Sequence, residues 1–170
     1  MSKPSPSSYP AYFSKYINLV PEVDLLTAFE NQLQVINEFL SKVTEERSTY
    51  AYAEGKWTLK ELLQHITDTE RIFCYRALCF ARKEKSSLPG FDENDYAASS
   101  QAGGRTWQSL SEEFLAVRES TLLLFKSFTV EALNSTGISN NNPMSVSAAG
   151  FIISGHFYHH RNIVEERYLV

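Results

Sequence analysis

Apolar side chains recur at intervals of three and four residues through four segments, and this periodicity restricts the fold more than any other feature. The segments lie at about residues 22–43, 59–83, 106–128 and 145–168. Because an α-helix has about 3.6 residues per turn, this spacing places the apolar side chains on one face of a helix. No stretch shows the strict alternation of a half-buried strand, and we find no internal repeat. We therefore predict an all-α protein that folds as a four-helix bundle.

Residues 84–105 form the longest break between the predicted helices. They include Pro89-Gly90 and Gly103-Gly104, which favour turns and end regular structure. A connection of this length in a compact domain either crosses the bundle or covers a functional site. We therefore expect a long crossover connection between helices 2 and 3, which would allow those two helices to lie parallel.

The length of 170 residues suits a single domain with a substantial core. We assign residues 21–170 to one four-helix-bundle domain, whose first helix opens at Pro21. Residues 1–20 are predicted to form an extended N-terminal arm. Because Tyr12, Phe13 and Tyr16 lie within it, we expect this arm to pack on the body of the domain.

The composition argues against several classes of protein. The net charge is −4, the pI is about 5.6 and no large Lys/Arg cluster occurs, so we expect no nucleic-acid partner. No long apolar run or signal peptide is evident, so we expect no membrane association and a cytoplasmic location. Cys74 and Cys79 point about 140° apart around a predicted helix and cannot bridge each other. We expect two buried, reduced thiols.

Three of the four histidines fall between positions 156 and 160. His156 and His160 lie about 40° apart around a helix, in the middle of its apolar face, whereas His159 lies on the edge of that face. His65 lies at the edge of the apolar face of the second predicted helix. Buried imidazoles need polar partners, and one shared divalent cation would satisfy three of them. We therefore predict that His65, His156 and His160 bind a metal, with a coordination position left for water or substrate.

The alternative is that each imidazole donates to a carbonyl or carboxylate across the bundle. The HxxxH spacing has low specificity by itself, and Phe157 stands where a zincin motif would have Glu. Among the neighbouring side chains, Glu61, Asp68 and His159 are candidates for contacts to the ligand rings or to substrate. Arg76 could hold an anionic substrate, although a helix-face ion pair is the alternative.

Six blocks of the sequence are similar to the DinB/YfiT-like superfamily, and they cover essentially the whole chain in the family order. They are GKWTLKELLQHITDTERIF at 55–73, YRAL at 75–78, LPGFDE at 88–93, NPMSV at 142–146, GHFYHH at 155–160 and EERY at 165–168. The resemblance implies a four-helix bundle with a crossed connection, often a homodimer, which binds a divalent metal. The positions that match the family's three metal-binding histidines are His65, His156 and His160.

The resemblance also implies a choice between activities. Characterised relatives include transferases that join low-molecular-weight thiols such as bacillithiol to electrophiles, and a mycothiol-dependent isomerase. Others are described only as metal-dependent hydrolases or damage-inducible proteins. Our first hypothesis is a thiol S-transferase that acts on small electrophiles. The alternatives are a metal-dependent hydrolase of a small ester or amide and a non-catalytic metal-binding protein of the stress response. Nickel, zinc, manganese and iron all accept imidazole, so the sequence leaves the metal open.

Overall fold

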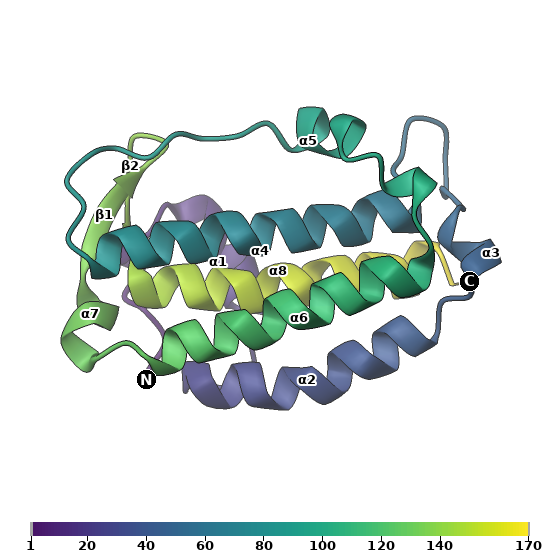
Figure 1. Cartoon of the computed structure of the whole chain (residues 1–170). Coiled ribbons are helices and arrows are strands. Elements are labelled where there is room, and N and C mark those ends of the chain that lie inside the picture. The colour runs from purple at the N-terminus through teal and green to yellow at the C-terminus, as the bar shows by residue number, and fades with distance from the viewer. Residues whose placement is uncertain (1, 170) are drawn as a thin grey trace.

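The computed structural model describes residues 2–169. Four long helices make up the body of the molecule (Figure 1). They are α2 (Leu25–Ser41), α4 (Leu59–Ala81), α6 (Trp107–Lys126) and α8 (Val146–Arg167). The predicted all-α four-helix bundle is therefore confirmed.

The helix starts are fixed by side-chain caps. Thr58 and Glu61 form a capping box at α4, in which each side chain accepts a hydrogen bond from the other's backbone N–H. Ser145 caps α8 by accepting a hydrogen bond from the N–H of Ala148. The first helix begins at Leu25, later than predicted, because the Asp24 carboxylate accepts the N–H of Thr27.

The long connection crosses the bundle as expected. Figure 1 shows that it runs back along α4, so that α4 and α6 point in the same direction. The connection is not a plain loop, since it contains α5 (Glu93–Ser99) and a 3₁₀ turn (Ala102–Gly104). Similarly, the connection between α2 and α4 contains a one-turn helix, α3 (Glu45–Ser48). These helices are too short for their apolar spacing to be recognised in the sequence.

A small antiparallel hairpin contradicts our expectation that the chain has no strands. After the short helix α7 (Val130–Asn134), β1 (Thr136–Ser139) pairs with β2 (Asn142–Ser145) at one end of the bundle (Figure 1). Asn140 and Asn141 form the turn at positive φ, which asparagine tolerates better than most residues. Four-residue strands, one with Pro143 in it, give no detectable alternation. Leu88 donates its N–H to Ile138 and accepts that of Asn140, which joins the crossover to the hairpin.

We predicted an extended N-terminal segment, but the structure shows that it is coiled into short turns. Two 3₁₀ turns (Pro6–Ser8 and Ala11–Phe13) precede α1 (Ser14–Ile17), and the side chain of Tyr16 is buried. Gly155 of α8 permits a close approach here, because a Cβ at that position would lie 2.0 Å from the Tyr16 carbonyl oxygen. The segment therefore rests directly against the helix that carries His156.

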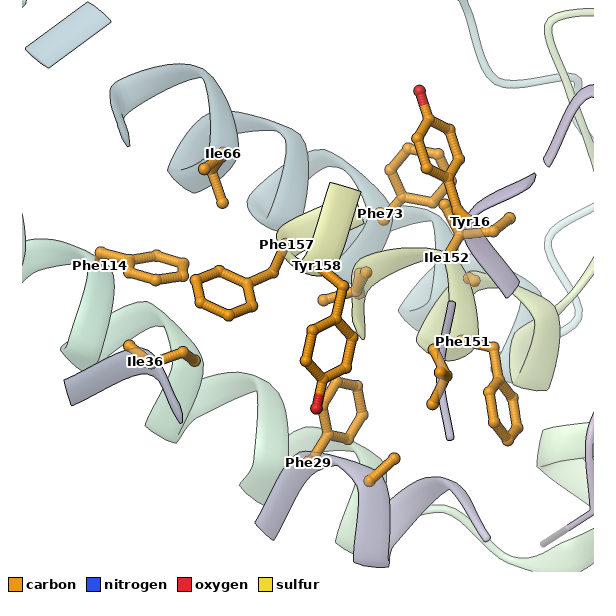
Figure 2. Close-up of a cluster of buried hydrophobic side chains, with 14 of the residues drawn as sticks. Tyr16, Phe29, Ile36, Ile66, Phe73, Phe114, Phe151, Ile152, Phe157 and Tyr158 are labelled. Carbon is orange, nitrogen blue, oxygen red and sulfur yellow. The ribbon is translucent and has the colours of Figure 1, made fainter. Parts of the chain in front are cut away.

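The core is rich in aromatic side chains from several helices. Figure 2 shows Phe114 of α6 beside Phe157 of α8, and their ring centroids lie 5.9 Å apart in a stacked arrangement. The Phe39 ring of α2 meets Phe157 edge-on at 5.6 Å. Aromatic burial of this kind supplies a large apolar area and a specific packing geometry, which together hold the helices in register.

A buried polar network also connects all four helices, and sequence reasoning did not identify it. Arg118 of α6, which has 0% of its surface exposed, donates to the carboxylate of Glu70 on α4 at 2.8 Å. It also donates to the side-chain oxygen of Gln32 on α2, whose amide nitrogen donates to the Ser154 carbonyl of α8 at 3.0 Å. The network fixes the helices by directional bonds as well as by apolar contact.

The structure bears on two expectations drawn from composition, which concern membrane-spanning helices and the cysteines. None of the helices within residues 2–169 is both long enough and apolar enough to span a membrane. Cys74 and Cys79 are free thiols, as expected, but they are half-buried and not fully buried.

Candidate metal centre

Three imidazoles from two antiparallel helices meet at one point inside the bundle. His65 Nε2 lies 3.1 Å from His156 Nε2, which in turn lies 3.0 Å from His160 Nε2. His156 and His160 stand one turn apart on α8, and α4 supplies His65 from across the helix interface. All three residues are buried. The structure thus brings together the three histidines that we predicted as metal ligands.

The arrangement fits a small divalent cation. Two nitrogens bound at about 2.0–2.1 Å to the same ion lie about 3 Å apart when they subtend an angle between octahedral and tetrahedral. The two observed separations are 3.0 and 3.1 Å, and the candidate ligand atoms of the trio all lie within 4.8 Å of one another. Adjacent rings cannot all donate to one another, so a cation that accepts every lone pair satisfies the group best.

Burial keeps these imidazoles neutral, which is the form that binds metal. Desolvation lowers the pKa of His65 to about 4, with a smaller effect from His159. Desolvation also holds the pKa values of His156 and His160 well below 6.5, and in both cases neighbouring imidazoles lower them further. At neutral pH the centre therefore presents lone pairs without first having to release protons.

The two carboxylates that we considered as partners of the rings are engaged elsewhere. Glu61 accepts hydrogen bonds from the backbone N–H and hydroxyl of Thr58, at 2.7 and 2.9 Å, within the capping box. Asp68 accepts from Gln64 at 2.9 Å and pairs with Arg71. The structure thus does not bring Glu61 or Asp68 to the imidazole nitrogens. Thr58 holds the Glu61 carboxylate, and Gln64 and Arg71 hold that of Asp68.

His159 lies beside the centre, whereas Arg76 lies further along α4. His159 is half-buried, and its ring meets His160 and Tyr16 edge-on at 5.0 and 5.2 Å without joining the trio. Arg76 is buried about three turns along α4 from His65, and none of the ion pairs within residues 2–169 includes it.

Two aromatic residues beside the centre were not predicted as part of it. Trp57 packs on His65 with ring centroids 4.7 Å apart, and Tyr16 meets His156 edge-on at 5.5 Å. The Tyr16 hydroxyl lies 3.2 Å from that of Tyr12. The aromatic character of the N-terminal segment is evident in the sequence, but its position over the histidines depends on the tertiary fold.

The centre opens onto a cavity. A space of about 320 Å³ is lined by His65 and His156 and by residues of the N-terminal segment, α4, the crossover and the hairpin. A second space, of about 230 Å³, reaches His160 from the side of Trp57 and Tyr168. The larger cavity has the size of a small-molecule site, and a substrate in it would lie against two of the three imidazoles.

Acidification should destabilise the metal-free protein. Since burial lowers the pKa of His65 from 6.5 to about 4, the unfolded chain binds a proton in this interval that the folded chain does not. The free energy of unfolding should therefore fall as the pH falls from about 6.5 towards about 4. At about pH 5, His65 alone would contribute a loss of about 2 kcal/mol.

Urea unfolding of chelator-treated protein at about pH 7 and about pH 5 measures this loss. A His65→Ala variant, which lacks one titrating imidazole, should show a smaller dependence. Equal stability of the wild-type protein at both pH values would contradict the burial of neutral imidazoles.

The fold is a four-helix bundle with a crossed connection, and three histidines converge inside it. Comparison with known proteins identifies a family with this fold. The chain belongs to the DinB superfamily, whose family model matches residues 28–164. It is similar in structure to YfiT from Bacillus subtilis, described as a probable metal-dependent hydrolase with an unusual four-helix bundle topology. The TM-score is 0.72 over 96% of this chain and 90% of that one, at 14% identity.

A sequence similarity covers a shorter region. Over 72 residues the chain is 25% identical to a "putative metal-dependent hydrolase" of Oceanobacillus iheyensis. The matched stretch spans 42% of each chain, less than half the length of that relative.

Proposed function

We propose that this protein is an enzyme that depends on one divalent transition metal held by His65, His156 and His160. The observation that carries this proposal is the convergence of three buried, neutral imidazoles on one point beside a cavity of about 320 Å³. A divalent cation, when bound by three neutral ligands, keeps its full charge and lowers the pKa of a coordinated water or thiol. The three ring nitrogens leave further coordination positions for such a group.

The surrounding side chains would protect and orient the reacting groups. Trp57 and Tyr16 pack on two of the three rings, which restricts the rotation of those rings. Gly155 allows the N-terminal segment to lie close against α8, so that Tyr12, Phe13 and Tyr16 form one wall of the cavity. Aromatic walls lower the local dielectric constant, which strengthens the electrostatic effect of a charge held beside them.

Within this class we favour the transfer of a low-molecular-weight thiol to a small electrophile. Glu61 and Asp68, the carboxylates nearest to His65 along α4, are held in other interactions and are poorly placed to act as general bases. A thiol, whose ordinary pKa is near 8.5, needs much less assistance to ionise than water does. We place this activity in the cytoplasm, where small thiols are kept reduced, in accord with the two free cysteines.

Hydrolysis of a small ester or amide is the second candidate. It is favoured by the descriptions of YfiT and of the Oceanobacillus protein, which both refer to metal-dependent hydrolysis. The same three histidines would serve either reaction.

A paired assay with reconstituted protein distinguishes them. Chelator-treated protein is reloaded with nickel, zinc, manganese or iron(II) and given a small thiol with monochlorobimane, and separately p-nitrophenyl acetate without thiol. We expect metal-dependent conjugation of the thiol above the uncatalysed rate, with loss of the activity in His156→Ala. Metal-dependent release of p-nitrophenol without conjugation would favour the hydrolase. Rates equal to those of the chelated protein in both assays would contradict an enzymatic role on these substrates.

A further inference from the structure

The cavity beside the histidines contains a buried cation that the metal centre does not use. Arg76 has 5% of its surface exposed and lines this cavity. One of its nitrogens, Nη2, donates to the Pro89 carbonyl at 3.0 Å. Its guanidinium carbon lies 5.0 Å from the ring centre of Phe73 and 5.9 Å from that of Phe91. Among the ion pairs formed within residues 2–169, none includes Arg76.

Two buried hydroxyl groups in the same cavity are also unpaired. Thr69 and Ser139 are 5% and 4% exposed, and neither hydroxyl has a hydrogen-bond partner within the described part of the chain. Threonine in a helix often donates to the carbonyl four residues earlier, as Thr67 does to Leu63 at 2.8 Å. Thr69 does not make this bond. Thr69 and Ser139 both line the cavity, and neither hydroxyl is held by a partner within the described part of the chain.

A buried guanidinium without a counter-ion is costly, and so is a buried hydroxyl without a hydrogen-bond partner, unless a ligand satisfies them. A guanidinium carries five N–H donors in a planar fork that matches an oxyanion, and both hydroxyls can add a donor. Arg76 is already fixed by Pro89 and by the two phenylalanine rings, so little side-chain freedom is lost on binding. These are the features of a built anion site.

The charge balance favours a carboxylate over a phosphate. Among the described residues, Arg76 is the only Lys or Arg that lines the cavity, and Glu93 also lines it. A phosphate monoester carries close to two negative charges at neutral pH and is usually held by several basic groups. One guanidinium with hydroxyl donors matches the single charge of a carboxylate.

We propose that Arg76, Thr69 and Ser139 bind the carboxylate of the substrate, and that the substrate is a monocarboxylic acid. Thr69 and Arg76 follow His65 by four and eleven residues on α4, about 6 and 16 Å along the helix axis between Cα atoms. The Arg76 guanidinium lies over Phe73 in the preceding turn, so the side chain reaches back towards Thr69. Phe73, Met144 and Ile152 also line the cavity, which suits an apolar part of the substrate. The assignment of the reacting group to the histidine end rests on the proposed function, whereas the carboxylate site stands on these side chains.

Binding of ω-phenylalkanoic acids tests the site without requiring turnover. A series from benzoate to 6-phenylhexanoate, with the methyl ester of each acid and phenyl phosphate, is titrated into wild-type protein by calorimetry, with and without nickel. We expect at least one acid to bind with a Kd of about 1 mM or lower, and about tenfold to hundredfold more tightly than its ester. Arg76→Met should lose this preference, and Arg76→Lys should retain part of it. Thr69→Val and Ser139→Ala should each weaken acid binding but leave ester binding unchanged.

Arg71→Met is the matched control, because Arg71 lies on the same helix but is exposed and pairs with Glu113 outside the cavity. Its acid binding should equal that of the wild type. Equal affinities for acid and ester, tighter binding of phenyl phosphate than of any acid, or no acid binding at all would each overturn the proposal. Nickel content, measured in the same samples, reports separately on the metal centre, so that absence of metal would contradict the proposed function without deciding the carboxylate site. The acid and ester comparison needs only wild-type protein, so it holds even where a variant fails to fold.

Discussion

Replacing any one of His65, His156 or His160 by alanine should abolish stable metal binding. In the proposed centre each ring supplies one of three protein ligands, and loss of a residue that merely supports a ligand already costs about tenfold to a hundredfold in metal affinity. We therefore expect each ligand variant to lose at least about a hundredfold in affinity for nickel or zinc, as measured by competition with a chromophoric chelator. His159→Ala, which removes a neighbouring ring outside the trio, should keep close to wild-type affinity.

The same variants distinguish a metal centre from histidines with a structural role. His160 Nδ1 is buried without a hydrogen-bond partner within residues 2–169, so the metal-free protein carries an unsatisfied polar group there. In the metal-free state, His160→Ala should therefore lower the free energy of unfolding by less than the loss of a fully hydrogen-bonded core histidine would. Loss of metal in all four histidine variants alike would contradict the assignment of ligands.

Arg118→Leu should lower the free energy of unfolding by about 3–5 kcal/mol. The substitution leaves the Glu70 carboxylate buried without its cation, and an uncompensated buried charge is strongly destabilising. It also removes the bond to Gln32 and so weakens the connection of α6 to α2. Urea unfolding at neutral pH measures the loss.

Two comparisons separate the charge effect from a general loss of packing. Arg118→Leu combined with Glu70→Leu should recover much of the stability, because the unpaired charge is removed along with its partner. Lys126→Met breaks the exposed pair between Lys126 of α6 and Glu30, which should cost less than about 1 kcal/mol. If Arg118→Leu cost no more than Lys126→Met, the buried network would not stabilise the bundle in the way described.

The features that could be predicted from the sequence are those that depend on local periodicity. The helical spacing of apolar residues was sufficient for the four long helices, and the Thr58–Glu61 cap and the Ser145 cap were evident from residue type and position. The convergence of His65 with the pair on α8 could be predicted because an imidazole on an inward helix face must lie close to the facing helix. The close approach of the ring nitrogens then follows from the packing of α4 against α8.

Features that depend on contacts between distant residues could not be predicted in the same way. Arg118 looks like an ordinary helix-face charge in the sequence, and only the approach of Glu70 and Gln32 makes it a buried centre. Thr69 and Ser139, whose hydroxyls have no partner among the described residues, line one cavity because β1 of the hairpin contacts α4. No local pattern in the sequence indicates that residues so far apart in the chain line the same cavity.

The metal content of the wild-type protein tests the central claim most directly. Purified protein is stripped with chelator, dialysed against nickel, zinc, manganese or iron(II) in turn, and analysed by inductively coupled plasma mass spectrometry. We predict about one equivalent of metal per chain for at least one of these ions, with a rise in melting temperature on binding. Failure of all four metals to bind or to stabilise the protein would mean that the three imidazoles are core residues, and the enzymatic proposal would be contradicted with them.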